Sequence, residues 1–239
     1  MTNNNRQTNN LILIGGGIMR KGETEKIDRW ILKRVRNQKK TKTPKVLFIP
    51  SASGDLKEYI QDFTNRYQEY GAMVDSLLLI KEAPSRMNIK KKFLNADLIY
   101  FGGGSAELLL KTFKKFKLEP ICAQVVKNGV LMGGLSAGAI IWGKKFLTFD
   151  RKGSRFVNFR IIDGLGWIDN LIIPHFDPLM LKSKIVLNLL KQNSELKSLA
   201  IGNRTAAYWK DKPTPLFKKQ EKSCLGLSLL IKDLTQKYE

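Results

Sequence analysis

Residues 134–138 read Gly-Leu-Ser-Ala-Gly, the G-x-S-x-G pattern that places a serine on a sharp turn between a strand and a helix. The apolar runs 130–132 and 139–142 flank this pattern and supply the strand and the helix. Small neighbours let the two elements approach closely, so that the hydroxyl of Ser136 projects from the carboxyl end of a sheet. The sequence therefore predicts Ser136 as a nucleophile, with the amide of Ala137 pointing the same way. The alternative is a glycine-rich turn in which the serine only caps the helix.

His175 is the only histidine in the sequence, and it follows the strand-like run 171–173 and Pro174. This position places it on the edge of the sheet where Ser136 is expected. Imidazole titrates near neutral pH and is the usual base for a serine nucleophile. The sequence therefore predicts His175 as the base, whereas a lone histidine can also be an ordinary surface or core residue. One histidine and two distant cysteines do not form a metal-ligand set, so no metal is expected.

The glycines of 102–104 follow the apolar run 98–101 and could add a second backbone donor for a developing oxyanion. The same loop could be a plain turn with Ser105 capping the next helix, or a phosphate cradle at the helix N-terminus. The earlier segment 15–17 has Arg20 where a dinucleotide fingerprint needs its third glycine. No cofactor is therefore expected.

Short apolar runs alternate with helix-period segments along the chain, which predicts an α/β fold with a doubly wound, mostly parallel sheet. Ligands of such folds bind beyond the carboxyl ends of the strands, where the glycine-rich and polar loops should converge. We expect one α/β domain over residues 11–239 after a flexible, polar segment at 1–10. The expected strands are 11–14, 46–49, 74–79, 98–101, 130–132, 171–173 and 199–201, and the expected helices are 24–36, 56–70, 106–116, 123–127 and 179–191.

The net charge of +21 raises the question of nucleic-acid binding. The lysines are spread over separate segments without interleaved aromatic residues, which favours a solvated surface. Nucleic acid is therefore not an expected partner, and attraction of acidic partners is the alternative. No run reaches the ~18 apolar residues of a membrane span. We expect a cytoplasmic protein without membrane contact and leave a homo-oligomer open.

Three linked motifs resemble the peptidase E family of serine peptidases, which includes aspartyl dipeptidases and cyanophycinases. They are the elbow Gly-Gly-Leu-Ser-Ala-Gly-Ala, the upstream Phe-Gly-Gly-Gly at 101–104, and the stretch from Gly164-Leu165-Gly166-Trp167 to Pro174-His175-Phe176-Asp177. The resemblance spans nearly the whole chain. It implies a fold like that of class I glutamine amidotransferases, a cofactor-free serine mechanism, and cleavage of short peptides next to aspartyl residues.

The resemblance implies Ser136 as nucleophile, His175 as base, and Gly103 with the amide of Ala137 as the oxyanion hole. Gly104 and Arg204 are the expected substrate-binding residues. The acidic residue that orients the histidine in this family is replaced here by Asn203. Three aspartates between the serine and the histidine are alternative partners, and a fourth close to the histidine is expected to shape its loop; these are Asp150, Asp163, Asp169 and Asp177.

A second departure concerns residues 178–181, Pro-Leu-Met-Leu, where family members often carry arginines. An acidic substrate needs a cation in the site, and Arg155, Arg160 and Arg204 are available in the sequence. The two departures favour an alternative function. The chain would then be a catalytically impaired family member that binds a peptide or an acidic small molecule.

Overall fold

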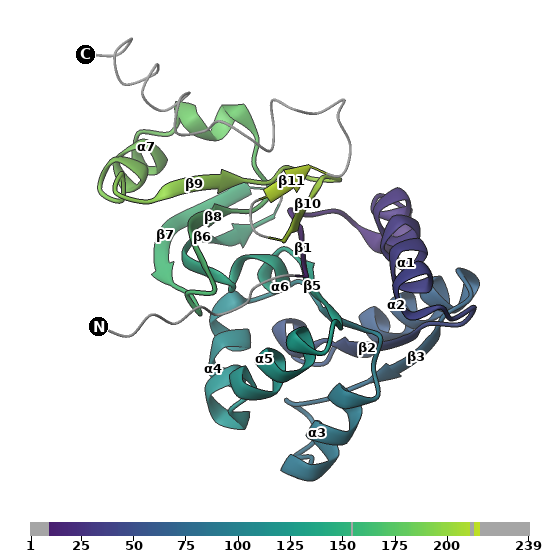
Figure 1. Cartoon of the computed structure of the whole chain (residues 1–239). Helices are drawn as coiled ribbons and strands as arrows, with labels where there is room; N and C mark the ends of the chain where they lie inside the picture. The colour runs from purple at the N-terminus through teal and green to yellow at the C-terminus, as the bar shows by residue number, and fades with distance from the viewer. Residues whose placement is uncertain (1–9, 154, 211–212, 216–239) are drawn as a thin grey trace.

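The computed structural model describes residues 10–153, 155–210 and 213–215, and it shows an α/β fold built around a seven-stranded sheet (Figure 1). The strand order is β11-β10-β1-β5-β4-β2-β3, and the strands from β1 to β3 in this order pair in parallel. β10 and β11 add antiparallel pairs at one edge. The bounds are β1 (Leu11–Ile14), β2 (Lys45–Ile49), β3 (Met73–Ser76), β4 (Leu98–Phe101), β5 (Leu131–Leu135), β10 (Ala206–Trp209) and β11 (Pro213–Pro215).

A second, four-stranded sheet has the order β7-β6-β8-β9 and lies beside the end of the main sheet (Figure 1). β6 and β7 form an antiparallel hairpin, and β8 and β9 continue the sheet in parallel. The bounds are β6 (Gly143–Lys152), β7 (Arg155–Asp163), β8 (Ile168–Ile173) and β9 (Lys197–Ala200).

Helices cover both faces of the main sheet, because its strands carry apolar side chains on both faces. On β1, Ile12 and Ile14 pack with α1 and α2, whereas Leu11 and Leu13 belong to the core under α3, α4 and α5. α7 covers the second sheet. The bounds are α1 (Glu25–Lys39), α2 (Lys57–Glu69), α3 (Arg86–Leu94), α4 (Ala106–Phe116), α5 (Glu119–Lys127), α6 (Ala137–Ile140) and α7 (Lys184–Lys191), with 3₁₀ helices η1 (Met19–Lys21), η2 (Ser51–Ser53) and η3 (Pro178–Lys182).

The predicted fold class is confirmed, and each of the expected strand segments overlaps a strand of the structure. The sequence analysis did not anticipate the hairpin β6–β7, nor that β8 and β9 leave the main sheet for a second one. The hairpin was missed because charged residues interrupt its apolar ones, as in Lys144-Lys145 and Asp150-Arg151-Lys152. The expected segment 1–10 lies almost wholly outside the described residues, and so does the end of the expected domain.

One expected helix, over residues 179–191, was wrong as a continuous element. The structure has η3 and α7 instead, separated at Ser183, whose backbone is extended (φ −78°, ψ 115°). The Ser183 hydroxyl accepts a hydrogen bond from the amide of Val186 at 3.5 Å and so caps α7. A capping serine within an apolar-periodic segment marks a helix start, and this signal was overlooked.

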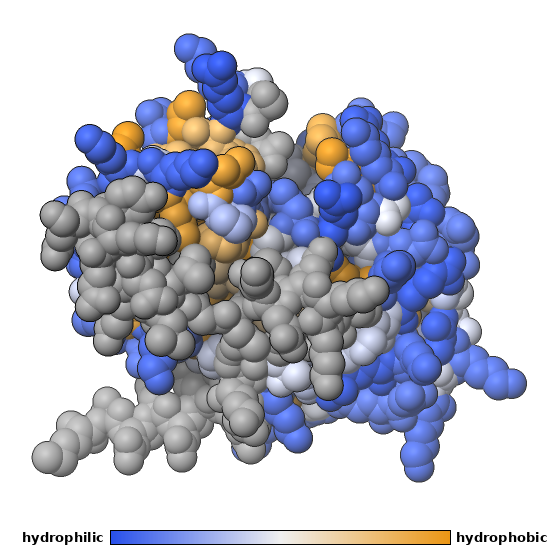
Figure 2. All heavy atoms as spheres, turned by 90° about the horizontal axis from the view of Figure 1, so that it is seen from above, coloured by the Kyte–Doolittle hydropathy of each residue, from blue (hydrophilic) through white to orange (hydrophobic). Residues whose placement is uncertain are grey.

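Hydrophilic side chains cover most of the described part of the face seen in Figure 2, and apolar side chains gather mainly in an area left of the centre, with a smaller group at the top right of it. In the part of the chain that the structure describes, no helix is both long and apolar enough to cross a bilayer.

A buried carboxyl group lies between the first two helices. Asp28 of α1 is fully buried, and its carboxylate accepts hydrogen bonds from the hydroxyls of Thr24 at 2.7 Å and Tyr67 at 2.8 Å. Burial raises the pKa of Asp28 from 3.8 to about 7, and the two hydrogen bonds offset this only in part. Asp28 is thus protonated in the folded state at pH values where it is ionised in the unfolded chain.

This pKa shift should make stability depend on pH. Between pH 3.8 and about 7 the native state holds a proton that the unfolded state releases, so the free energy of unfolding falls as the pH rises through this window. Asp28→Asn removes the ionisation, and we expect the stability of the variant relative to that of the wild type to rise as the pH increases from about 4 to about 7. Urea unfolding at several pH values measures the difference. An equal pH dependence in both proteins would contradict the prediction, and Glu82→Gln, which changes an exposed carboxylate, serves as control.

Candidate active site

Ser136 lies on the turn between β5 and α6, where the sequence predicts it. Its backbone has φ 50° and ψ −108°, an unfavourable conformation for a residue with a side chain that costs about 1–3 kcal/mol. A β-carbon on Gly134 or Gly138 would lie 1.9 or 2.1 Å from the carbonyl oxygen of Phe101, so both positions require glycine. The Ser136 side chain makes no cap hydrogen bond to α6. The strained turn therefore presents the hydroxyl outward, and the reading of Ser136 as a helix cap is wrong.

His175 follows β8 and meets Ser136 from the second sheet. Its Nε2 lies 2.8 Å from the Ser136 Oγ, and its side chain is largely buried. The backbone amide of His175 donates to the carbonyl of Gly15 at 3.0 Å, which ties the histidine to the loop after β1. The rings of Phe149 and Phe156, from the β6–β7 hairpin, lie with their centroids 5.8 and 5.6 Å from the imidazole. The two sheets thus each supply one member of a serine–histidine pair.

Asn203 completes a chain of three side chains. Its Oδ1 lies 2.6 Å from the His175 Nδ1. An amide oxygen only accepts hydrogen bonds, so this contact requires a hydrogen on Nδ1 and leaves Nε2 free to accept the serine proton. Asn203 therefore selects the tautomer that a general base needs. It brings no negative charge to stabilise the imidazolium that forms when His175 takes the proton.

The aspartates considered as alternative partners of His175 lie elsewhere. Asp150 binds Arg160 and Asn158, and Asp169 lies 3.1 Å from the ammonium group of Lys144. Asp163 is exposed at the end of β7. Asp177 accepts from the amide of Leu179 at 2.9 Å, so it shapes the start of η3, as expected for a loop residue. The structure thus places the amide of Asn203, rather than one of these carboxylates, against the imidazole.

Gly16 allows the histidine and the asparagine to meet. A β-carbon at this position would lie 2.2 Å from the Asn203 Oδ1 and 2.3 Å from the His175 Nδ1. The loop after β1 therefore passes directly against the hydrogen bond that orients the base. The sequence analysis expected the glycine-rich loops, the run 15–17 among them, to converge at this edge of the sheet, but it gave Gly16 no role of its own, because nothing in the sequence shows what lies opposite it.

Gly16→Ala should therefore damage the site without unfolding the chain. The added methyl group must push His175 and Asn203 apart, and a displacement of about 1 Å in a catalytic geometry can cost ~10²-fold in rate. We expect a loss of that order in the rate of serine labelling by a fluorophosphonate, with little change in melting temperature. Gly22→Ala is a control for backbone strain alone: alanine is strained there at φ 71°, but its β-carbon would have no contact closer than 3.8 Å, so we expect at most a lower melting temperature and an unchanged labelling rate. An unaffected labelling rate in Gly16→Ala would refute this role of Gly16.

The oxyanion site needs backbone amides beside Ser136. Ala137 is the first residue of α6, and the structure shows no acceptor for its amide among the described residues. Gly103 lies next to the nucleophile, since a β-carbon built on it would be 3.7 Å from the Ser136 Cβ. Its amide, however, donates to the hydroxyl of Tyr59 at 3.2 Å. Gly103 can therefore serve as an oxyanion donor only if a substrate oxygen replaces this hydroxyl, a contact that the sequence analysis missed.

Ser136 and His175 open into a cavity of about 760 Å³, which is large enough for a short peptide. Gly103, Gly104 and Ser105 form one wall, and Ser105 caps α4 by accepting from the amide of Leu108 at 3.2 Å. The loops predicted to converge do so in part: Gly17, the 103–105 loop, Ser136 and His175 all line the cavity. The remaining lining residues are Ile18, Met19, Arg20, Leu56, Glu58, Tyr59, Asp62, Glu107, Leu135, Thr148, Phe149 and Asp150.

Of the two expected substrate-binding residues, one lines the cavity and the other does not. Gly104 lines the cavity, and a β-carbon there would lie 2.1 Å from the carbonyl oxygen of Ala52. Arg204 is exposed and is not a lining residue; its backbone amide donates to the carbonyl of Gly16 at 2.8 Å. A substrate contact by the Arg204 side chain therefore stays a prediction. No group of three or more His, Cys, Asp or Glu residues that could hold a metal ion occurs within the described ranges.

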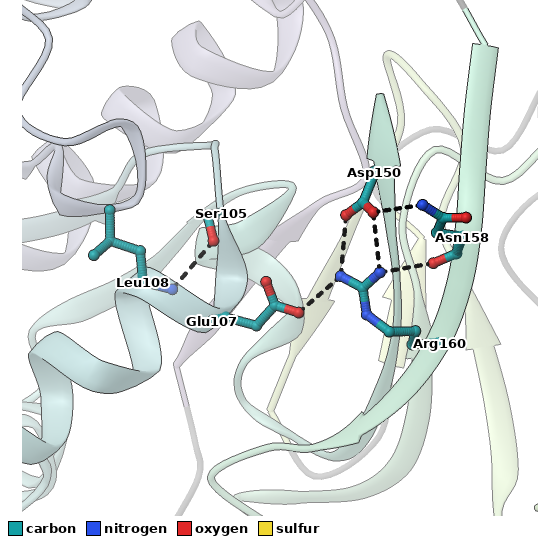
Figure 3. Close-up of polar contacts among 6 residues, drawn as sticks. All are labelled: Ser105, Glu107, Leu108, Asp150, Asn158 and Arg160. Carbon is teal, nitrogen blue, oxygen red and sulfur yellow. Dashed lines mark hydrogen bonds and ion pairs between the residues drawn. The ribbon is translucent and has the colours of Figure 1, made fainter. Parts of the chain in front are cut away.

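Arg160 of β7 reaches across to α4 at the edge of the cavity (Figure 3). Its guanidinium group binds both carboxylate oxygens of Asp150, at 3.1 and 3.3 Å, and a carboxylate oxygen of Glu107 at 2.9 Å. It also donates to the backbone carbonyl of Asn158 at 2.9 Å. The hydrogen bonds from Arg160, followed by the one from Asn158, lower the pKa of Asp150. These contacts join the β6–β7 hairpin, which contacts His175, to α4, the helix that follows the glycine loop 102–104.

Comparison with known proteins links this geometry to one family. The model of peptidase family S51 matches residues 11–215. Over 163 residues the chain is 34% identical to YgaJ, an uncharacterized peptidase of Bacillus subtilis (strain 168), and the match covers 68% of this chain and 66% of that protein. The chain thus spans just under two thirds of the length of this relative.

Two solved structures share the fold. One is a protein from Listeria monocytogenes EGD-e assigned as a peptidase E, with a TM-score of 0.61 and 21% identity over 87% of this chain and 99% of that chain. The other is a peptidase from an acI-B1 Actinobacterium, with a TM-score of 0.59 and 22% identity over 84% and 83% of the two chains. At these identities the likeness concerns the fold, which resembles that of class I glutamine amidotransferases.

Proposed function

The chain belongs to peptidase family S51, a family of serine peptidases, and we propose that it cleaves short peptides with Ser136 as nucleophile and His175 as general base. The observation that supports this most strongly is the 2.8 Å contact between the Ser136 Oγ and the His175 Nε2 on a strained turn. A serine hydroxyl is a weak nucleophile unless an adjacent base takes its proton. The contact of Asn203 with Nδ1 favours the tautomer in which Nε2 can do so.

In the first half of the reaction, the Ser136 Oγ attacks the peptide carbonyl carbon while its proton passes to the His175 Nε2. The carbonyl oxygen becomes an oxyanion, for which the amide of Ala137 supplies one donor and the amide of Gly103 a second when the oxyanion replaces the Tyr59 hydroxyl as its acceptor. The carbon–nitrogen bond then breaks, and the leaving amine takes the proton from Nε2. The products of this half are a free amine and an acyl group esterified to Ser136.

In the second half, a water molecule attacks the acyl carbon and gives its proton to the His175 Nε2. The ester bond breaks, Oγ regains the proton from Nε2, and the acid leaves. Asn203 keeps the imidazole oriented in both halves but adds no charge. We therefore propose a slower reaction than the same site would give with a carboxylate at this position.

Labelling with a fluorophosphonate, followed by intact-mass measurement, tests the proposal. We expect one adduct on the wild type and none on Ser136→Ala, with strongly reduced labelling of His175→Ala because the serine then lacks its base. Absence of an adduct on folded wild-type protein, or an adduct that persists in Ser136→Ala, would contradict the assignment of the nucleophile.

One observation favours a second candidate, a peptide-binding protein without turnover: Asn203 replaces the expected acidic residue. Arg160 is already bound to two carboxylates, which leaves it unavailable for an acidic ligand. Cleavage next to aspartyl residues therefore stays a prediction of the family resemblance. Binding of peptides that is unchanged in Ser136→Ala, together with no labelling of the wild type, would favour this second candidate.

A further inference from the structure

The charge of the cavity is opposite to that of the chain. The sequence has 42 lysines and arginines against 21 aspartates and glutamates. Of the cavity-lining residues within the described ranges, Arg20 is the one Lys or Arg, whereas four carry carboxylates: Glu58, Asp62, Glu107 and Asp150. Carboxylates in a concave site create a local field that attracts cations, although the chain as a whole is basic. Ser136 and His175 line the same cavity and mark it as a ligand site.

Two of the four carboxylates are already neutralised in part. Arg160 spans Asp150 and Glu107, as Figure 3 shows, and uses both terminal nitrogens of its guanidinium group in doing so. A substrate carboxylate could reach this arginine only by displacing one of its two acidic partners. The arginine therefore maintains the wall of the cavity and does not supply a free positive charge to the substrate.

Glu58 and Asp62 differ from this pair. They are four residues apart on α2 and therefore share one face of the helix, which lines the cavity. Neither has an ion-pair partner among the described residues. Two like charges at this spacing repel each other on a helix, and a concave site strengthens their combined field. A cation in the cavity would relieve this repulsion.

We propose that Glu58 and Asp62 are specificity-determining residues that bind a cationic group, an ammonium or a guanidinium, of the peptide attacked by Ser136. The inference rests on the proposed peptidase function and deepens it: the preferred substrates are basic peptides, and acidic ones are disfavoured. The cation can be a lysine or arginine side chain or the free amino terminus of a short peptide. Both sources present the same chemistry to a pair of carboxylates.

Diphenyl phosphonate inhibitors test this without a known substrate, because they react with an activated serine and need no turnover. The set pairs a lysine side chain with norleucine, which has a similar length and no charge, and adds an aspartate analogue; each is made with a free and with an acetylated amino group. The rate of adduct formation on Ser136 is followed by intact mass. In at least one of the two comparisons, lysine against norleucine or free against acetylated amino group, we expect the cationic inhibitor to react about tenfold faster, and we expect the slowest reaction with acetylated aspartate.

The matched comparison identifies the source of the charge. A preference for lysine over norleucine indicates the side chain, and a preference for free over acetylated inhibitors indicates the amino terminus. In the double variant Glu58→Gln, Asp62→Asn the ratio of the two inactivation rates should fall close to one, each rate being divided by the fluorophosphonate labelling rate of the same protein. Glu82→Gln, an exposed acidic residue outside the cavity lining, should keep the full preference.

The outcomes separate this inference from the proposed function. Failure of the fluorophosphonate to label Ser136 would overturn the peptidase assignment itself. Normal fluorophosphonate labelling with no effect of charge on phosphonate inactivation, or a preference that survives in the double variant, would overturn only the assignment of Glu58 and Asp62. Faster reaction of the aspartate analogue would overturn it as well and would favour an acidic substrate.

Discussion

Ser136→Ala is expected to lower kcat for any peptide that the protein cleaves by up to about 10⁶-fold, the loss found on removing the nucleophile of a complete Ser-His-Asp triad, and by less if the missing charge at Asn203 already slows the reaction. The variant keeps the β-carbon on the strained backbone at φ 50°, and it loses one hydrogen bond, the 2.8 Å contact with His175. Stability should therefore change by only ~1 kcal/mol. Hydrolysis of a panel of short peptides and thermal unfolding measure the two quantities.

The double variant Ser136→Ala, His175→Ala tests whether the two residues act as one unit. Residues that act as one unit are not additive, so the double variant should be about as slow as Ser136→Ala alone. A further loss on removal of His175 would mean that the histidine acts outside the pair. Hydrolysis by Ser136→Ala at the wild-type rate would exclude Ser136 as the nucleophile.

Asn203→Asp is expected to increase kcat. Aspartate has the same shape as asparagine, so one of its oxygens can occupy the position 2.6 Å from the His175 Nδ1 and add the charge that stabilises an imidazolium. The reverse change, Asp to Asn in a Ser-His-Asp triad, costs ~10⁴-fold in kcat, in part through a wrong tautomer. Because Asn203 already selects the right tautomer here, we expect a smaller gain of about tenfold or more.

Hydrolysis of a short peptide measures kcat, and the rate of fluorophosphonate labelling at neutral pH should rise with it, because both depend on transfer of the Ser136 proton to His175. Asn203→Ala and Asn203→Glu are the controls. Asn203→Ala should be slower than the wild type, because it loses the hydrogen bond that orients the imidazole. Asn203→Glu restores the acidic side chain expected from the family, with one more methylene. A rate for Asn203→Asp equal to the wild-type rate would show that the missing charge does not limit the reaction.

Local patterns predicted much of the core and the members of the site. Short apolar runs between helix-period segments gave β1 and β4 with their observed bounds, and the glycine-flanked serine gave the turn that carries Ser136. Both signals reside in neighbouring residues, because strand formation and a tight turn depend on the side chains within a few positions. The only histidine, His175, follows an apolar run and Pro174, and this position alone predicted that it lies on the same edge of the sheet as Ser136.

The sequence by itself determined which residue types could act, whereas the tertiary structure decided which of them meet. The hydrogen bond between His175 and Asn203 depends on a loop from β1 that approaches closely enough to require Gly16, and no local pattern encodes such a contact. The charged residues give a second example. The sequence offered Arg160 as a cation that could bind an acidic substrate, but in the structure Arg160 lies on β7 between Asp150 and Glu107 and binds both. Contacts between segments distant in sequence are set by the packing of the two sheets, and a single sequence carries no direct record of that packing.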